Sequence, residues 1–298
     1  MLVSYVRSFA PRTARSCATA RPPTNPNATA PKMVKFRVYR YSPNDANHSD
    51  AVPPRMQEYE IDVNKCGPMV LDALLYIHDN CDPTLSFRRA CREGVCGSCA
   101  MNISGKNGLA CLQRIDDNVS GGAVTVRPLP HFRVIKDLIA DMTHFFEMYA
   151  SVKPWLQHSP EEEKKQEKML DAALAAGSTV KPTETRQSPE QRKKLDGLYE
   201  CVLCGCCSGS CPSFWWSEDA DRRFMGPSAL LHTHRWLSDS RDAATEQRLD
   251  ELRNDPFRAY KCHTILNCNA ACPKHLDPAK SVHSVRNMLC ESPVKHDE

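Results

Sequence analysis

Eleven of the sixteen cysteines in this 298-residue chain fall into three runs whose spacings are those of iron–sulfur ligands. In the first run, Cys91, Cys96 and Cys99 are separated by four and then two residues, and Cys111 follows. This is the spacing of a plant-type [2Fe–2S] centre. Thiolates are soft donors that suit the iron of such clusters. The first run therefore predicts a [2Fe–2S] site with these four ligands.

The second and third runs have the spacing of a two-cluster centre of the bacterial type. The second has four cysteines followed by Pro212, and the third has three followed by Pro273. In such centres the first three cysteines of a run bind one cluster and the fourth binds the other. This crossing predicts a [4Fe–4S] cluster on Cys201, Cys204, Cys207 and Cys272. It leaves three thiolates for the other cluster: Cys211, Cys262 and Cys268.

One ligand of that last cluster is missing. The position three residues after Cys262 is Ile265, whose side chain cannot bind iron. We therefore predict a three-liganded [3Fe–4S] centre. Cys206 is an alternative ligand because it lies beside Cys207. Its use would leave only one residue after Cys204, too short a loop to wrap a cubane, so we expect Cys206 not to bind iron.

Other uses of many cysteines fit less well. Zinc sites favour two cysteine pairs with a finger-length spacer, unlike these dense runs. Disulfide frameworks belong mainly to short secreted domains, whereas this chain is long and 41% hydrophobic, enough for ordinary cores. The net charge of +3, with acidic and basic residues interspersed, gives no electrostatic footprint for nucleic acid. No segment approaches the roughly eighteen apolar residues of a transmembrane helix.

The first 32 residues have a composition of their own. They contain five basic residues, several Ser, Thr and Ala, and no Asp or Glu. This composition is typical of a mitochondrial transit peptide and lacks the continuous apolar stretch of a secretory signal. A disordered basic tail is the alternative.

The elements that must position the first cysteine run form a small mixed sheet. Three segments alternate as strands: 34–39, 58–63 and 123–127. Residues 69–80 place apolar side chains on one helical face, and residues 104–108 form a hairpin turn that leads to Cys111. We expect an α+β chain whose residues 33–131 form a β-grasp domain of the plant-type [2Fe–2S] ferredoxin kind.

The rest of the chain has a helical pattern. From residue 133, apolar side chains recur at three- and four-residue steps as far as Tyr149. Further helices are expected at 227–238, 243–254 and 278–290, with the cysteine runs in the turns between them. We predict an all-helical, bacterial-type two-cluster ferredoxin domain over residues 132–298. Its charged segment at 157–196 is expected to be an exposed excursion.

Five stretches carry a resemblance to one family: residues 86–103 (SFRRACREGVCGSCAMNI), 195–207 (LDGLYECVLCGCC), 211–216 (CPSFWW), 261–268 (KCHTILNC) and 272–274 (CPK). From about residue 34 to 290, the chain resembles the iron–sulfur subunits of mitochondrial succinate dehydrogenases, respiratory complex II. The resemblance implies the same ligands as the spacing, with Ile265 and Cys206 as non-ligands. The excursion at 157–196 is longer than this family usually carries, and it either extends an exposed hairpin or contacts an additional subunit.

The resemblance also implies a function. An FAD-containing flavoprotein partner would oxidise succinate, and this chain would pass single electrons through the [2Fe–2S], [4Fe–4S] and [3Fe–4S] clusters to ubiquinone. Hydrophobic membrane-anchor subunits would hold it peripherally on the matrix side of the mitochondrial inner membrane. No residue of the chain is expected to be catalytic. The alternatives are the iron–sulfur subunit of a quinol:fumarate reductase and a free multi-cluster ferredoxin carrier.

A quinone site is expected beside the three-iron cluster. Trp215 and Trp216 follow Cys211 closely, and His263 directly follows Cys262. The family implies that Trp216 donates a hydrogen bond to a quinone carbonyl. It implies a pocket lined by Pro212, Ser213, Trp215, His263 and Ile265. Packing of both tryptophans in a core or subunit interface, and hydrogen bonding of His263 to the backbone, are the alternatives.

Overall fold

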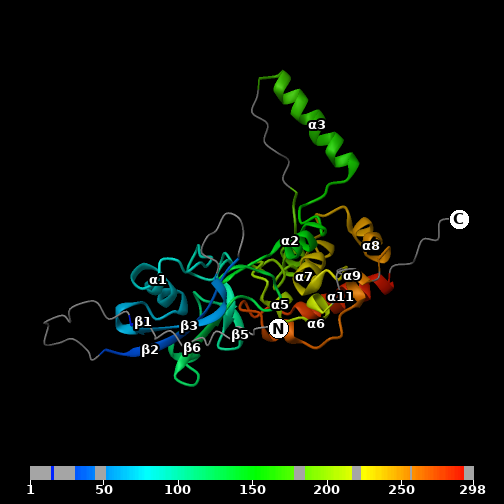
Figure 1. Ribbon diagram of the computed structural model, residues 1–298. Coiled ribbons are helices and arrows are strands. Elements are labelled where there is room, and N and C mark those ends of the chain that lie inside the picture. Colours follow the sequence, from blue (N-terminus) through cyan, green and yellow to red (C-terminus); the bar gives the residue numbers. More distant parts are fainter. Residues whose placement is uncertain are drawn as a thin grey trace, which may run out of the picture.

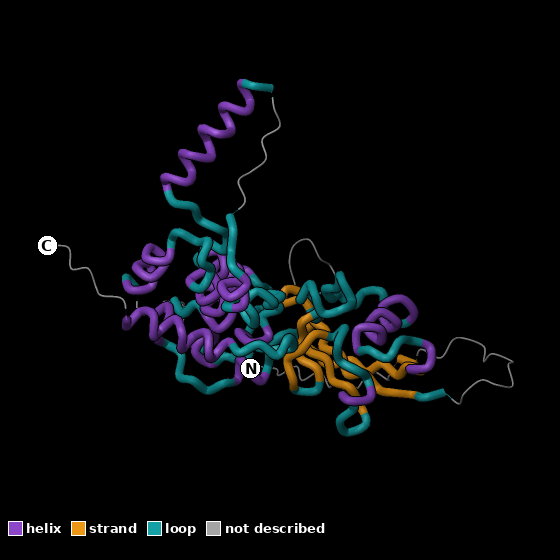
Figure 2. Tube along the Cα trace, turned by 180° about the vertical axis from the view of Figure 1, so that it is seen from behind, coloured by secondary structure: helices purple, strands orange, loops and turns teal. Residues whose placement is uncertain are grey.

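The computed structural model describes residues 15–16, 31–43, 52–177, 185–216, 223–255 and 257–291. A strand-rich part is followed by a helical part, and the two lie side by side (Figures 1 and 2). The expected transit-like segment at 1–32 lies outside the described residues except at 15–16 and 31–32.

The strand-rich part is a six-stranded mixed sheet with the order β1-β3-β2-β6-β4-β5. The strands are β1 (Arg15–Ser16), β2 (Met33–Ser42), β3 (Val52–Asp62), β4 (Ala100–Ile103), β5 (Lys106–Leu109) and β6 (Ala123–Arg127). Exposed and buried side chains alternate along β2, which is antiparallel to β3 and parallel to β6. The buried face of the sheet packs on α1 (Val70–Asn80). The strands expected at 34–39 and 123–127 and the helix at 69–80 are therefore confirmed, and the strand at 58–63 is the end of the longer β3.

The hairpin β4–β5 carries two of the cysteines of the first run. Its turn uses Ser104 and Gly105, both with positive φ (47° and 88°), as a tight hairpin turn requires. Ala100 pairs with Leu109, so Cys99 just before β4 lies across from the end of β5, where Cys111 follows. The hairpin thus brings together two cysteines that lie twelve residues apart in the sequence.

The helix expected from residue 133 begins only at α2 (Thr143–Ala150), so the expectation was wrong for residues 134–140. They form an antiparallel hairpin, β7 (Val134–Lys136) and β8 (Ile139–Ala140). Asp137 lies in the turn of this hairpin with a φ of 44°. Its buried carboxylate accepts hydrogen bonds from the backbone N–H groups of Tyr41 and Ser86, both at 2.9 Å, and from the side chain of Arg40. These hydrogen bonds to distant segments stabilise the hairpin, so residues 134–140 do not form the helix that their apolar periodicity predicts.

The helical part packs around α7 (Gly226–Leu237) and α11 (Pro278–Glu291), with α8 (Thr245–Arg253) beside them. These three confirm the expected helices to within two residues. The short helices are α4 (Pro189–Lys193), α5 (Cys206–Gly209), α6 (Pro212–Trp215), α9 (Phe257–Tyr260) and α10 (Asn267–Ala270), with 3-10 turns at Val63–Lys65 and Asp116–Asn118. Buried Arg248 ties the core together because it pairs with Asp242 and donates to the carbonyls of Val152, Lys153 and Trp155.

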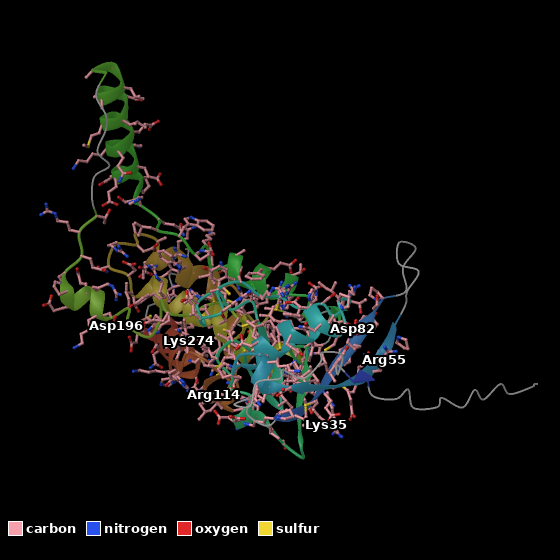
Figure 3. All side chains as sticks on the ribbon, turned by 90° about the vertical axis from the view of Figure 1, so that its left-hand side faces the viewer. Lys35, Arg55, Asp82, Arg114, Asp196 and Lys274 are labelled. Carbon is pink, nitrogen blue, oxygen red and sulfur yellow. The ribbon has the colours of Figure 1, made fainter. Side chains whose placement is uncertain are left out.

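The excursion was expected over 157–196, but Leu195 near its end is buried in the body. The exposed part is α3 (Pro160–Ala175), which stands away from the body (Figure 1). Ser159 and Glu162 form a capping box at its start, and none of its residues is buried. Its side chains point into solvent on several sides (Figure 3). Within the described ranges, no helix is both long and apolar enough to span a bilayer.

Candidate functional site

The loop that carries the first cysteine run directs backbone N–H groups at a thiol. The N–H groups of Glu93, Val95 and Cys96 donate to Cys91 Sγ at 3.5, 3.3 and 3.2 Å. These bonds lower the pKa of Cys91 to about 6. Because the thiolate is the form that binds metal, the loop prepares Cys91 as a ligand.

The other thiols of this run have a different environment. Cys99 and Cys111 are buried, with 3% and 4% exposure, and burial raises the pKa of Cys99 to about 12. The Cys99 thiol interacts electrostatically with those of Cys96 and Cys111. A buried thiol of this kind gives up its proton when a metal takes its place. The structure thus brings the four thiols together at the end of the β4–β5 hairpin.

The loops of the second and third runs follow the same backbone course. Positive φ angles occur at equivalent positions in both: Leu203 (53°) and Gly205 (79°), Thr264 (56°) and Leu266 (66°). Each loop then enters a four-residue helix, α5 or α10, and ends at a cysteine followed by proline. Three non-glycine residues accept a conformation that is uncommon for side chains with a Cβ. This repeated geometry indicates that both loops wrap similar groups.

The repeat defines which residues are equivalent. Cys201 corresponds to Cys262, Cys207 to Cys268, and Cys211 to Cys272. The equivalent of Cys204 is Ile265, which lies between the two positive-φ residues of its loop. The third loop therefore has the same backbone conformation as the second but offers one thiol fewer.

Two cavities of similar size lie beside these loops. One, of about 20 Å³, is lined by the thiols of Cys201, Cys204, Cys207 and Cys272. The other, also of about 20 Å³, is lined by Cys211, Cys262 and Cys268, with Ile265 in its wall. The last cysteine of each run, Cys211 or Cys272, lines the cavity of the other run. Among the described residues, no three His, Cys, Asp or Glu side chains converge closely enough for a single metal ion, so the thiols line cavities instead.

Backbone and hydroxyl groups also face these sulfurs. The N–H groups of Thr264 and Leu276 donate to Cys262 Sγ and Cys272 Sγ, both at 3.4 Å. Ser228 Oγ lies 3.7 Å from Cys201 Sγ. Such bonds set the potential of a bound cluster, and the donor set of thiols with N–H groups fits iron–sulfur clusters.

Cys206 is placed differently from its neighbours. It is completely buried on α5 and packs against Leu129 and Ala140, and the lining of the four-thiol cavity includes Cys204 and Cys207 but not Cys206. The side chain belongs to the contact between the two parts of the chain.

The first and second cysteine loops touch. A Cβ added to Gly97, whose φ is 71°, would lie 2.4 Å from the Val202 carbonyl and 3.1 Å from the Cys204 Cα. Asn107 on β5 donates to Ser210 Oγ at 2.9 Å and thereby ties the hairpin to the second loop. No side chain intervenes where Gly97 meets the other backbone, so the two candidate cluster sites are close neighbours.

A hollow of about 340 Å³ opens beside the three-thiol cavity, and it is lined by Pro212, Ser213, Trp216, Lys261 and His263. Pro212, Ser213 and His263 also line the three-thiol cavity, so the two are adjacent. Trp216 is 74% exposed and offers its indole to this hollow. Sequence reasoning missed Lys261, although its position directly before Cys262 was a signal.

Two expected lining residues lie elsewhere. Ile265 lies in the wall of the three-thiol cavity. Trp215 faces a crevice between the two parts of the chain, where its ring stacks on His131 with centroids 3.5 Å apart. The structure thus brings four of the six expected residues to the hollow, and the other two adjoin it.

The chain is similar in sequence and fold to known proteins. The sequence model of the 2Fe-2S iron-sulfur cluster binding domain matches residues 35–147, and that of the 4Fe-4S dicluster domain matches residues 197–276. The mitochondrial succinate dehydrogenase [ubiquinone] iron-sulfur subunit of Dictyostelium discoideum is 47% identical over 96% of this chain and 93% of its own. The succinate dehydrogenase iron-sulfur subunit of Paracoccus denitrificans is 49% identical over 88% of this chain and 90% of its own. A chain of the Mycobacterium smegmatis Sdh1 complex in the apo form has a similar fold, with a TM-score of 0.69, 22% identity and coverage of 89% of this chain and 100% of that one.

Proposed function

Because the chain belongs to the family of succinate dehydrogenase iron–sulfur subunits, we propose that it relays single electrons from an FAD-containing flavoprotein to ubiquinone. The observation that carries this proposal is the row of neighbouring thiol sites. The first loop touches the second at Gly97, and the second and third loops exchange cysteines across α5 and α10. Close sites of this kind suit stepwise transfer of one electron at a time.

The clusters are assigned to three thiol sets. Cys91, Cys96, Cys99 and Cys111 bind a [2Fe–2S] cluster. Cys201, Cys204, Cys207 and Cys272 bind a [4Fe–4S] cluster, and Cys211, Cys262 and Cys268 bind a [3Fe–4S] cluster. When bound, these groups supply one-electron redox chemistry. The protein supplies thiolates, backbone N–H donors and burial, which hold the clusters and tune their potentials.

The substitution at Ile265 supports a three-iron cluster at the end of the relay. The loop has the backbone of its four-thiol counterpart, but Ile265 gives no ligand for a fourth iron. Cluster type and net charge both influence the reduction potential of an iron–sulfur cluster. The three-thiol cavity also adjoins the hollow at Trp216, so it is the site best placed to deliver electrons outward.

We assign that hollow to the quinone head group. Trp216 offers an indole N–H to a quinone carbonyl, and His263 and Lys261 add polar groups on the same side. Pro212 and Ser213 complete the lining, while Trp215 and Ile265 support the pocket from behind. The imidazole of His263 has ring nitrogens that can donate or accept a proton, so it is suited to passing protons to the reduced quinone.

The exposed Trp216 and its hollow fit a peripheral position at a membrane. Tryptophan is favoured at interfaces where one side is apolar and the other is wet. Hydrophobic anchor subunits would cover this face on the matrix side of the mitochondrial inner membrane. The quinol:fumarate direction uses the same relay, and the transit-like composition of residues 1–32 favours succinate oxidation.

The substitution Trp216→Phe in the purified complex tests the quinone assignment. The ring is retained and the N–H is lost, so we expect full iron content and a KM for a short-chain ubiquinone that rises about threefold to tenfold, as for one lost hydrogen bond. Trp155→Phe is the control because Trp155 is also exposed but is not part of the hollow. Unchanged quinone kinetics in Trp216→Phe would refute the assignment.

A further inference from the structure

Three aromatic rings form a continuous stack at the surface of the molecule. His131 lies parallel to Trp215, with ring centroids 3.5 Å apart and an interplanar angle of 3°. Trp215 is in turn stacked with Trp216, at 5.6 Å and 15°. His131 comes from the segment between β6 and β7, whereas the tryptophans belong to α6 and its C-terminal end. The stack therefore links the first part of the chain to the hollow at Trp216.

The backbone holds His131 firmly in place. Its φ is 65°, a conformation that costs energy for a residue with a side chain and persists only where the surroundings impose it. On one side, the Pro130 carbonyl lies against Gly209, where an added Cβ would come within 3.1 Å of it. On the other side, the ring of Phe132 packs against that of Phe214, with ring centroids 6.3 Å apart. Both contacts fix the segment on the helical part.

Trp216 has little else to hold it. Its side chain is 74% exposed, and α6 is only four residues long. Phe214 is the buried anchor of this short helix, packed against Gly226 and 5.3 Å from the ring of His144. The indole of Trp216 therefore depends on the face of Trp215 for its orientation.

Trp215 is itself held by stacking. Its Nε1 atom is buried and has no hydrogen-bond partner within the described part of the chain. No polar bond thus fixes the angle of this indole, and His131 covers its face in parallel. Partial burial lowers the pKa of His131, so near pH 7 its ring stacks as a neutral aromatic group.

We propose that His131 is a positioning residue that stacks on Trp215 and thereby holds the indole of Trp216 in place at the hollow. The proposal rests on the assignment of this hollow to the quinone. In the relay, the segment between β6 and β7 then has two roles: it connects the two parts of the chain, and it orders the electron-accepting site. His131 is not among the residues that line the hollow or the three-thiol cavity.

The test compares His131→Ala with His131→Phe in the purified complex. We expect His131→Ala to raise the KM for a short-chain ubiquinone about threefold to tenfold, the range for the loss of one aromatic stacking contact. Succinate-dependent reduction of a soluble dye that accepts electrons before the quinone should be unchanged. His131→Phe retains a planar ring and should restore the KM. His158→Ala is the control, because this half-buried histidine pairs with Glu162 far from the stack.

Each outcome supports or overturns the proposal. An unchanged KM in His131→Ala, or a KM in His131→Phe as high as that of the alanine variant, overturns it. An equal loss of dye and quinone activity would also overturn it, because that pattern indicates a general structural role. Trp216→Phe separates the two assignments. If it raises the KM but His131→Ala does not, only the positioning role fails, and if neither does, the quinone assignment fails as well.

Discussion

A single side chain distinguishes the two halves of the helical cluster region. Cys204 and Ile265 occupy equivalent places in loops that share two positive-φ residues, a four-residue helix and a final Cys-Pro. The loop at Ile265 has kept the backbone of a cubane site. In the proposed assignment, one ligand and not a different fold therefore decides which type of cluster is bound.

Ile265→Cys should convert the three-iron site to a cubane. Ile265 is 52% exposed, so the substitution should cost little stability, and the new thiol would stand where Cys204 stands in the other loop. We expect four irons at this site, loss of the EPR signal of the oxidised protein, and slower quinone reduction because cluster type sets the potential. Ile265→Val should behave as the unchanged protein. An oxidised-state signal that persists in Ile265→Cys would contradict the equivalence.

Spacing alone predicted the thiol sets, because ligand loops are local and their chemistry permits few residue types. It could not predict the roles of residues that act through distant contacts. His131 meets Trp215 only because two segments more than eighty residues apart pack together. Lys261 carried a weak signal, its position before Cys262, and the structure was needed to place it in the hollow.

At the scale of elements, the cluster loops depend on tight backbone approaches. Gly97 meets the Val202 carbonyl and the Cys204 Cα at a place where the two ferredoxin-like parts touch. The β4–β5 hairpin delivers Cys99 and Cys111 to the same end of the sheet. In the proposed assignment, these elements would set the spacing between the first two clusters.

Gly97→Ala should disturb this contact. The new Cβ would lie 2.4 Å from the Val202 carbonyl, so one loop must move in addition to the strain of a positive φ. We expect lower iron content and slower succinate–quinone turnover. Gly105→Ala is the matched control, since its φ is also positive but nothing lies within 4 Å of the added Cβ. It should lower the free energy of unfolding by about 1 kcal/mol without changing the turnover of the loaded protein. If both variants lowered iron content and turnover equally, the close contact at Gly97 would not be the cause of the loss.

The arm α3 should be dispensable for folding, because none of its residues is buried. The segments on either side of it bind the same turn of the body: the N–H of Gln157 donates to Asp242, and the side chain of Gln187 donates to Asp239. Replacement of residues 160–184 by a short Gly-Ser linker should leave the Tm and the iron content unchanged, because no residue of α3 belongs to an apolar core. Differential scanning calorimetry would measure this. A clear fall in Tm would mean that the arm contributes to the core or to a stabilising contact within the complex.

The hairpin at residues 134–140 marks where sequence patterns mislead. Apolar residues at three- and four-residue steps predict a helix, yet Asp137 accepts hydrogen bonds from segments around residues 41 and 86. Local periodicity does not report such long-range bonds. The helices at α7, α8 and α11 were predictable because their apolar faces are buried against each other in a single core.

At the scale of the whole molecule, the α+β architecture expected from the sequence is confirmed by the sheet, by the helical core and by the two matching domain families. The two parts contact each other where the first and second cysteine loops meet. In the proposed relay, this contact would also carry electrons from the first cluster to the second.

The stability of the whole fold should depend on pH through His232. This histidine on α7 is 8% exposed, its ring lies 4.9 Å from that of Tyr149, and burial lowers its pKa from 6.5 to about 4. Between these two pKa values the unfolded chain binds more protons than the folded chain. The contribution of His232 to stability is therefore fully present above pH 6.5 and is lost as the pH falls towards 4. We expect a loss on the order of 2 kcal/mol by about pH 5.

Thermal unfolding of His232→Gln at about pH 7 and pH 5 checks this expectation. The variant lacks the titrating group, so its Tm should fall less between the two pH values than that of the unchanged protein. His158→Asn should behave as the unchanged protein because His158 is only partly buried. Identical pH dependence in all three proteins would show that His232 does not control acid stability.

The most direct test of the electron relay is low-temperature EPR of the protein as isolated and after reduction by succinate or dithionite. We predict a signal in the oxidised protein that disappears on reduction, as for a [3Fe–4S] cluster, while the signal of a reduced [2Fe–2S] cluster appears. Cubane signals alone would contradict the assignment at Ile265 and require another ligand in its place. A colourless, EPR-silent protein that contains zinc would contradict the relay itself.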